Sequence, residues 1–210
     1  MSSGVPAHSA LRTVTYTSGE LVVANGIKTS FATVAAPVAL GPADFNGANV
    51  AAGGLGFITG LPRSLTIVRS NNAAQFSVAP IVVVGRRGGK EITESLTPGS
   101  ADGNDTLHTS SGFDSITSIS IPTQGGTGGT FTIGVQDICA PHGDKFQGIE
   151  LAAAGNINVQ YGEGSGAPTD SIPIATAQVG VVKSIAPTRI RTNASLTNPT
   201  IVGLTVYLTS

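Results

Sequence analysis

The sequence predicts an all-β protein: an antiparallel β-sandwich, jelly-roll-like or immunoglobulin-like, with an extended N-terminal arm. Hydroxyl and aliphatic residues alternate with a period of two in many short segments, so that in a strand one set faces a core and the other faces outward. Valine and threonine, which favour strands, supply much of this alternation. No window places apolar residues at the helical spacing i, i+3, i+4, i+7 over three turns, so little helix is expected.

The clearest alternation is Thr-Phe-Thr-Ile-Gly-Val at 130–135, and the pattern returns at 156–161 and 203–208. It predicts further strands at Arg12–Thr17, Ser64–Arg69, Phe76–Val84, Lys90–Leu96, Ser115–Ile121, Gln178–Ile185 and Arg189–Arg191. Between these strands, glycine- and proline-rich segments predict loops at Gly85–Gly89, Thr97–Ser111, Gln124–Gly129 and Gly162–Pro173. The first loop joins two alternating strands and predicts a hairpin.

The first 60 residues differ from the rest in composition. Alanine, glycine and valine dominate residues 24–60, so this stretch has few large side chains with which to fill a core. We therefore expect residues 1–58 to form an N-terminal arm with short strands and residues 59–210 to form the sandwich, the alternative being that the first 60 residues are the opening strands of one large sandwich. Such an arm would become ordered against a neighbouring molecule, at an entropy cost that contact area offsets.

Charged residues are scarce throughout the chain. Only 11% of the 210 residues are Asp, Glu, Lys or Arg, against about 25% in ordinary globular domains. Because 40% of the residues are hydrophobic and the formal net charge is −1, the chain should fold rather than remain disordered. A surface with so little charge adheres to its neighbours, which predicts a subunit of a large assembly. Nucleic acid is not an expected partner, since phosphate binding needs a basic face.

A membrane is not an expected partner either. The longest aliphatic run, Ile81–Val84, is far shorter than the roughly 20 residues that a membrane helix needs. The first residues show neither the basic region nor the apolar region of a secretory signal. We therefore expect the protein to be made and assembled in the cytoplasm.

Candidate catalytic and metal-binding residues do not form a recognisable pattern, so we expect no enzyme, no metal and no cofactor. His8, His108 and His142 are too far apart for metal-ligand spacing. Cys139 is the single cysteine, which excludes an internal disulfide, and it is interpreted as a small buried hydrophobe. His142 lies only three residues beyond it, but nothing else in the sequence supports a nucleophile and base pair.

Two loops superficially suggest ligand sites. In Gly85–Lys90 the lysine is followed by Glu91 and a strand, whereas a phosphate loop continues with Ser or Thr into a helix. The loop at 102–105, Asp-Gly-Asn-Asp, offers oxygen ligands but lacks the distal Glu of a calcium loop. The first is interpreted as a basic hairpin tip that could meet an acidic patch on a partner, and the second as a turn.

Four segments, taken in order, carry a resemblance to a known family. They are Pro-Arg-Ser-Leu-Thr-Ile-Val at 62–68, the hairpin Val-Val-Val-Gly-Arg-Arg-Gly-Gly-Lys-Glu-Ile-Thr-Glu at 82–94, Phe-Asp-Ser-Ile-Thr-Ser-Ile at 113–119 and Thr-Phe-Thr-Ile-Gly-Val at 130–135. This order resembles small β-sandwich virion proteins of tailed bacteriophages, including capsid decoration or cement proteins. The resemblance covers roughly residues 60–135, with a compatible last strand at 200–208.

The resemblance implies a structural virion protein that decorates and cements the capsid shell from outside by bridging neighbouring major capsid subunits. Its partners would be the major capsid protein and further copies of itself, a trimer being one option. The alternatives are a tail, neck or fibre component of a phage, and a carbohydrate-binding β-sandwich module. The residues expected to contact partners lie at the hairpin tip and in the arm: Arg86, Arg87, Lys90, Val22, Phe31, Val34 and Phe45.

Overall fold

The fold is described from a computed structural model for residues 11–16, 23–52, 55–70, 75–99, 104–141, 146–152, 155–161, 170–174, 180, 184, 187–192 and 204–209. These residues form antiparallel sheets and one 3₁₀ turn, η1 (Pro42–Asp44), with no α-helix among them. The predicted all-β sandwich is therefore confirmed. The strands are β1 (Leu11–Tyr16), β2 (Val23–Ala32), β3 (Val38–Leu40), β4 (Arg63–Ser70), β5 (Ile81–Arg87), β6 (Lys90–Leu96), β7 (Asp105–His108), β8 (Ser115–Ile121), β9 (Thr130–Cys139), β10 (Phe146–Leu151), β11 (Gly155–Gln160), β12 (Asp170–Ile174), β13 (Arg189–Thr192) and β14 (Leu204–Thr209).

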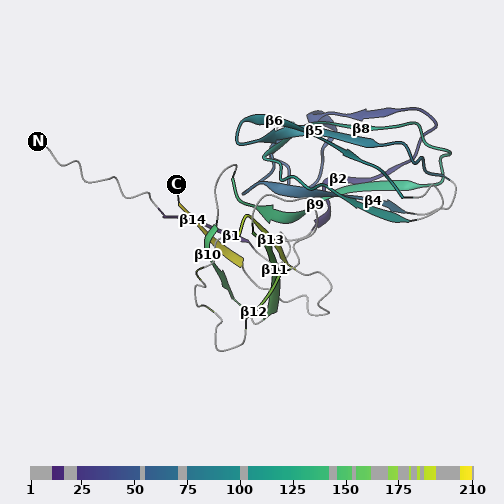
Figure 1. The fold of residues 1–210 in the computed structure, drawn as a ribbon. Helices are drawn as coiled ribbons and strands as arrows, with labels where there is room; N and C mark the ends of the chain where they lie inside the picture. Colours follow the sequence, from purple (N-terminus) through teal and green to yellow (C-terminus); the bar gives the residue numbers. More distant parts are fainter. Residues whose placement is uncertain are drawn as a thin grey trace, which may run out of the picture.

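Strands β2 to β9 form a jelly roll, which decides between the two sandwich types that the sequence left open. β5 pairs with β6, β4 with β7, β3 with β8 and β2 with β9, all antiparallel. These nested pairs alternate between two sheets, one ordered β3-β8-β5-β6 and the other containing β9-β4-β7 with β2 beside β9. Eight strands wound in this way make the double-sheet jelly roll. Figure 1 shows the two sheets stacked, with β5, β6 and β8 above β2, β9 and β4.

Alternation along the strands builds the core between these two sheets. Ile81 and Val83 of β5 face Phe131 and Ile133 of β9 within one buried cluster, and all four side chains are at most 1% exposed. The ring of Phe131 stacks on Phe31 and meets Phe76 edge to face. This cluster supplies the main apolar burial of the jelly roll, and such burial is the dominant favourable contribution to folding.

A second lobe lies beside the jelly roll and uses the chain on both sides of it (Figure 1). One of its sheets has the order β1-β14-β10, and the other, β12-β11-β13, continues through β13 onto the end of β9. Its own apolar cluster includes Phe146, Leu151, Val159 and Val206, each fully buried. The described fold therefore has two cores.

Strand β9 belongs to both cores. Its first part contributes Phe131, Ile133 and Val135 to the jelly-roll cluster, while Ile138 and the following Ala140 belong to the cluster of the second lobe. The register between β4 and β9 shifts between Arg63 and Leu65. Such an irregularity re-aims the side chains of a strand, which lets one strand serve two cores.

Strand pairing crosses the expected boundary at residue 58. Within residues 1–58, β2 pairs with β9 and β3 pairs with β8, so both are integral strands of the jelly roll. Ile27 and Leu40 are buried in its core. Small residues such as alanine and glycine are compatible with a packed strand where backbones approach closely: a Cβ on Gly134 would lie 1.9 Å from the Val23 carbonyl oxygen. Residues 1–10 of the predicted arm lie outside the described residues.

The remaining strand predictions differ from the structure in detail. The strand predicted at Phe76–Val84 begins only at Ile81, directly after Pro80, which has no N–H to donate to a sheet. The expected loops at Thr97–Ser111 and Gly162–Pro173 contain β7 and the start of β12. Most of the strand predicted at Gln178–Ile185 lies outside the described residues.

Candidate interaction surface

The outer side of the four-stranded sheet β3-β8-β5-β6 presents a regular surface of alternating side chains. In β5 the odd-numbered residues from Ile81 to Gly85 are buried, while Val82 and Val84 are half-buried and Arg86 is exposed. Because directly paired residues project to the same side of a sheet, the partners of these three residues on β6 and β8 complete the face. We call it the outer face.

The outer face consists of three rows across the strands. The first row is Ala39, Ser120, Val82 and Ser95. The second is Ser118, Val84 and Thr93, and the third is Phe57, Ser115, Arg86 and Glu91. The first two rows contain only hydroxyl and aliphatic side chains. A partner can therefore cover them without desolvating a charge.

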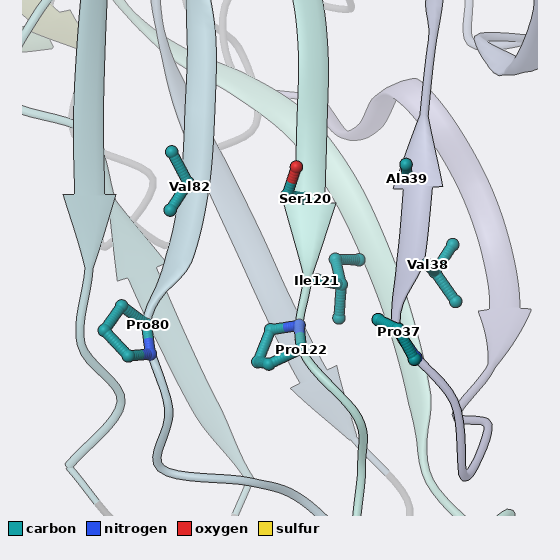
Figure 2. A pocket seen from close by; sticks show the side chains of 8 residues that line it. All are labelled: Pro37, Val38, Ala39, Pro80, Val82, Ser120, Ile121 and Pro122. Carbon is teal, nitrogen blue, oxygen red and sulfur yellow. The ribbon is translucent and has the colours of Figure 1, made fainter.

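A shallow apolar groove lies at the first row, where the strands of this sheet begin or end. It has a volume of about 330 Å³. Figure 2 shows Pro37, Pro80 and Pro122 at the strand ends, with Ala39, Ser120 and Val82 of the first row beside them. Its lining is apolar except for the hydroxyl of Ser120: Pro37, Val38, Ala39, Pro80, Val82, Ser120, Ile121 and Pro122. Proline ends give the groove a rigid rim.

The third row, at the other end of the same sheet, carries an exposed aromatic ring on a fixed backbone. Phe57 is 52% exposed, and the neighbouring Leu55 is 63% exposed. The carbonyl of Phe57 accepts a hydrogen bond from the Ala51 amide, and the carbonyl of Gly56 accepts one from the Ile116 amide. Gly56 has a φ of +68°, and a Cβ there would lie 2.1 Å from the Ile116 carbonyl oxygen. The chain thus holds Phe57 in place by a turn that requires glycine.

Charged side chains are mostly satisfied inside the molecule. Among the Asp, Glu, Lys and Arg side chains that the structure describes, all but Arg86, Lys90 and Glu91 make a contact within the chain. Two pairs are ionic: Arg69 with Asp105 and Arg189 with Asp137. Three cations donate to backbone carbonyls: Arg63 to Gln136 and Asp137, Arg87 to Ala140, and Lys28 to Asp44. The other carboxylates accept hydrogen bonds: Glu150 from the Tyr207 hydroxyl, Asp44 from the Gly41 amide, Glu94 from the Ser110 and Ser111 amides, and Asp114 from the Gly88 amide. The described surface is therefore even poorer in free charge than the composition indicates.

A buried polar joint connects the jelly roll to the second lobe. Asp137 on β9 is fully buried, and its Oδ2 lies 2.8 Å from Nε of Arg189 on β13. Arg189 also donates to the Thr109 carbonyl at 2.9 Å, and Arg63 donates to the carbonyls of Gln136 and Asp137. Buried charges are tolerated when they are paired and hydrogen-bonded in this manner. The joint holds β9 where it passes from one core to the other.

Cys139 lies in this joint and is 2% exposed. Burial raises the pKa of its thiol to about 11, because a thiolate loses its hydration in the interior. This placement agrees with the interpretation of Cys139 as a buried hydrophobe. His142 lies outside the described residues.

The predicted contact residues lie in four different settings. Arg86 and Lys90 are exposed at the β5–β6 turn, and Val34 is exposed shortly after β2, where its carbonyl accepts a hydrogen bond from the Gln124 amide. Arg87 instead turns to the Ala140 carbonyl at 2.9 Å. Phe45 is 8% exposed and Phe31 packs on Phe131, so both serve the core of the jelly roll. Val22 lies outside the described residues.

The exposed position of Phe57 and the groove were not predicted from the sequence. Phe57 lies in a glycine-rich stretch that was assigned to the arm, and an isolated aromatic there has no periodic pattern. The groove combines residues from β3, β5 and β8, which only the strand order brings together.

The described residues include neither a metal-binding cluster nor a membrane-spanning helix. They contain no group of three or more His, Cys, Asp or Glu side chains placed to hold a metal ion. In the loop suggestive of calcium binding, Asp105 pairs with Arg69 at 3.0 Å, and residues 101–103 lie outside the described part. No helix of that part is long and apolar enough to cross a membrane.

Comparison with protein-family models, with curated proteins and with solved structures gave no match to this chain.

Proposed function

We propose that this chain is a structural protein of a tailed-phage virion that decorates and cements the capsid shell. The observation that carries the proposal is the outer face, whose first two rows and groove contain no charged side chain. A flat, uncharged sheet face with an apolar groove suits a contact that must be covered for the lifetime of a particle. The partner on this face would be the major capsid protein.

The fold supports the proposal by analogy. Jelly rolls recur in viral capsid and lectin domains, and a fold alone does not define a function. Between a capsid role and a lectin role, the groove favours the capsid role. Sugar-binding grooves usually present aromatic rings that stack on the sugar, and none of the lining residues of this groove is aromatic. Bridging many equivalent sites on a symmetric shell would multiply modest contacts into strong cohesion.

The test has two parts. The first is the copy number of the protein in purified virions by quantitative mass spectrometry. Hundreds of copies are expected for a cement protein, a handful would indicate a tail, neck or fibre part, and absence from virions would refute a structural virion role.

The second part is rebinding of purified protein to shells that lack it. Ser120→Glu places a charge in the groove and should lower occupancy about tenfold or more, since a carboxylate would have to be desolvated. Thr106→Glu adds the same charge to an exposed position of β7 on the other sheet and should bind like the wild type. Equal binding of Ser120→Glu and wild type would remove the outer face from the proposal.

A further inference from the structure

The third row of the outer face combines two unusual features of the described surface. It contains the exposed Phe57 ring, and it includes Arg86 and Glu91, with Lys90 at the adjacent turn. These three are the charged side chains that no contact within the described chain satisfies. A protein that pairs its other described charges internally has therefore left three of them at one end of this sheet, two of which, Arg86 and Glu91, lie in the row with an exposed aromatic ring.

From this juxtaposition we infer that the third row is the anchoring part of the interface, and that it fits a protein surface with an apolar socket next to carboxylates. Aromatic and arginine side chains dominate the binding energy of protein interfaces. Along the row, Arg86 lies between the ring and Glu91, whereas Lys90 pairs with Arg87 and projects to the other side of the sheet. The charge nearest the ring is therefore positive, which is complementary to a carboxylate beside the socket. The inference rests on the proposed function, in which that surface belongs to the capsid shell.

The backbone of this row is suited to an anchor. Phe57 bridges to Ser115, which in turn pairs with Arg86, so ring and guanidinium lie on neighbouring segments of one sheet. The amide of Ile58 donates to the Asp114 carbonyl at 2.8 Å, which fixes the chain directly after the ring. A side chain presented on a held backbone loses less conformational freedom on binding.

The described surface of a second copy of this chain does not offer the complementary carboxylate and socket. The groove on the outer face is apolar but has no carboxylate among its lining residues. Among the described carboxylates, Glu91 belongs to the row itself and Asp44 is the other exposed one, with its Oδ2 occupied by the Gly41 amide. The structure therefore favours a different protein as the occupant.

The experiment measures binding of full-length variants to virion shells that lack this protein. Phe57→Ser should weaken binding about tenfold or more, the loss expected of a buried aromatic anchor. The matched control is Tyr161→Ser, which removes a ring of similar exposure, 53%, from the second lobe. It should leave binding unchanged.

Two charge variants test the sign of the interaction. Arg86→Glu should weaken binding, whereas Glu91→Arg, in the neighbouring strand, should strengthen it, and both effects should shrink at high salt. Equal binding of Phe57→Ser and wild type, or the same direction of change for both charge variants, would overturn the inference while the proposed function stands. If wild-type protein does not bind shells at all, the proposed function fails first. If free wild-type protein self-associates and Phe57→Ser abolishes this self-association, the occupant is a second copy and the inference is overturned.

Discussion

The jelly roll and the second lobe reach similar β-architectures by different routes through the chain. The eight strands of the jelly roll come from one continuous segment, 23–139, and its innermost pair, β5 with β6, is a hairpin closed by Gly88 and Gly89, both at positive φ. The second lobe instead pairs the two ends of the chain, with Leu11 opposite Thr209. One unit winds outward from a local turn, and the other closes only when distant segments meet.

Because of this difference, the second core depends on the first more than the first depends on the second. Contacts between segments far apart in sequence cost more loop-closure entropy before they form. The second lobe therefore gains most from a template, and β9 supplies one, since β13 pairs with its last residues. The joint around Asp137 fastens that template to the jelly roll.

The largest effect is expected from breaking the joint. Asp137→Ala leaves the buried Arg189 without its ion-pair partner, which should lower the free energy of unfolding by about 3–5 kcal/mol. Chemical denaturation followed by circular dichroism measures the loss. Glu91→Ala, at an exposed carboxylate without a contact among the described residues, is the control and should change the value by no more than about 0.5 kcal/mol. A loss below 1 kcal/mol for Asp137→Ala would mean that the joint does not couple the lobes.

Two cavity-forming variants, one in each core, test whether the two lobes open independently. Ile133 in the jelly roll and Ile149 in the second lobe are both fully buried, and replacement by alanine should cost about 2–5 kcal/mol at each site. Hydrogen exchange should show early opening of β10 and β14 alone in Ile149→Ala, because the jelly roll is locally wound. In Ile133→Ala both lobes should lose protection, since the second depends on β9. Identical exchange patterns would contradict the proposed order of dependence.

The smallest effect concerns Cys139. Because burial raises the pKa of this thiol to about 11, iodoacetamide at pH 8 should alkylate it slowly in the folded protein and rapidly in denaturant. The sign for stability follows from the same shift: the unfolded thiol ionises first, so the free energy of unfolding should fall as the pH rises from about 9 to about 11. Mass spectrometry counts the alkylated fraction. Fast alkylation of folded protein would place Cys139 at a mobile surface instead of in the joint.

Several elements could be predicted from local pattern because their physics is local. The strands at Lys90–Leu96 and Ser115–Ile121 coincide with β6 and β8, since one buried face imposes a period of two. Strands β2 and β3 were missed as parts of the sandwich because small residues carry a weak alternation, although their backbones pair with β9 and β8. In the candidate surface, exposure of Arg86 and Lys90 could be foreseen from the glycine-rich turn, but the inward turn of Arg87 to Ala140 could not.

The all-β class, the hairpin at 85–89 and the scarcity of charge follow from the sequence alone, because composition and period-two alternation act through near neighbours. The jelly-roll strand order, the sharing of β9 between two cores and the placement of Phe57 in one row with Arg86 arise only in the folded chain. Those features depend on which strands pair across long separations, and pairing is selected by the fit of whole faces rather than by any single segment.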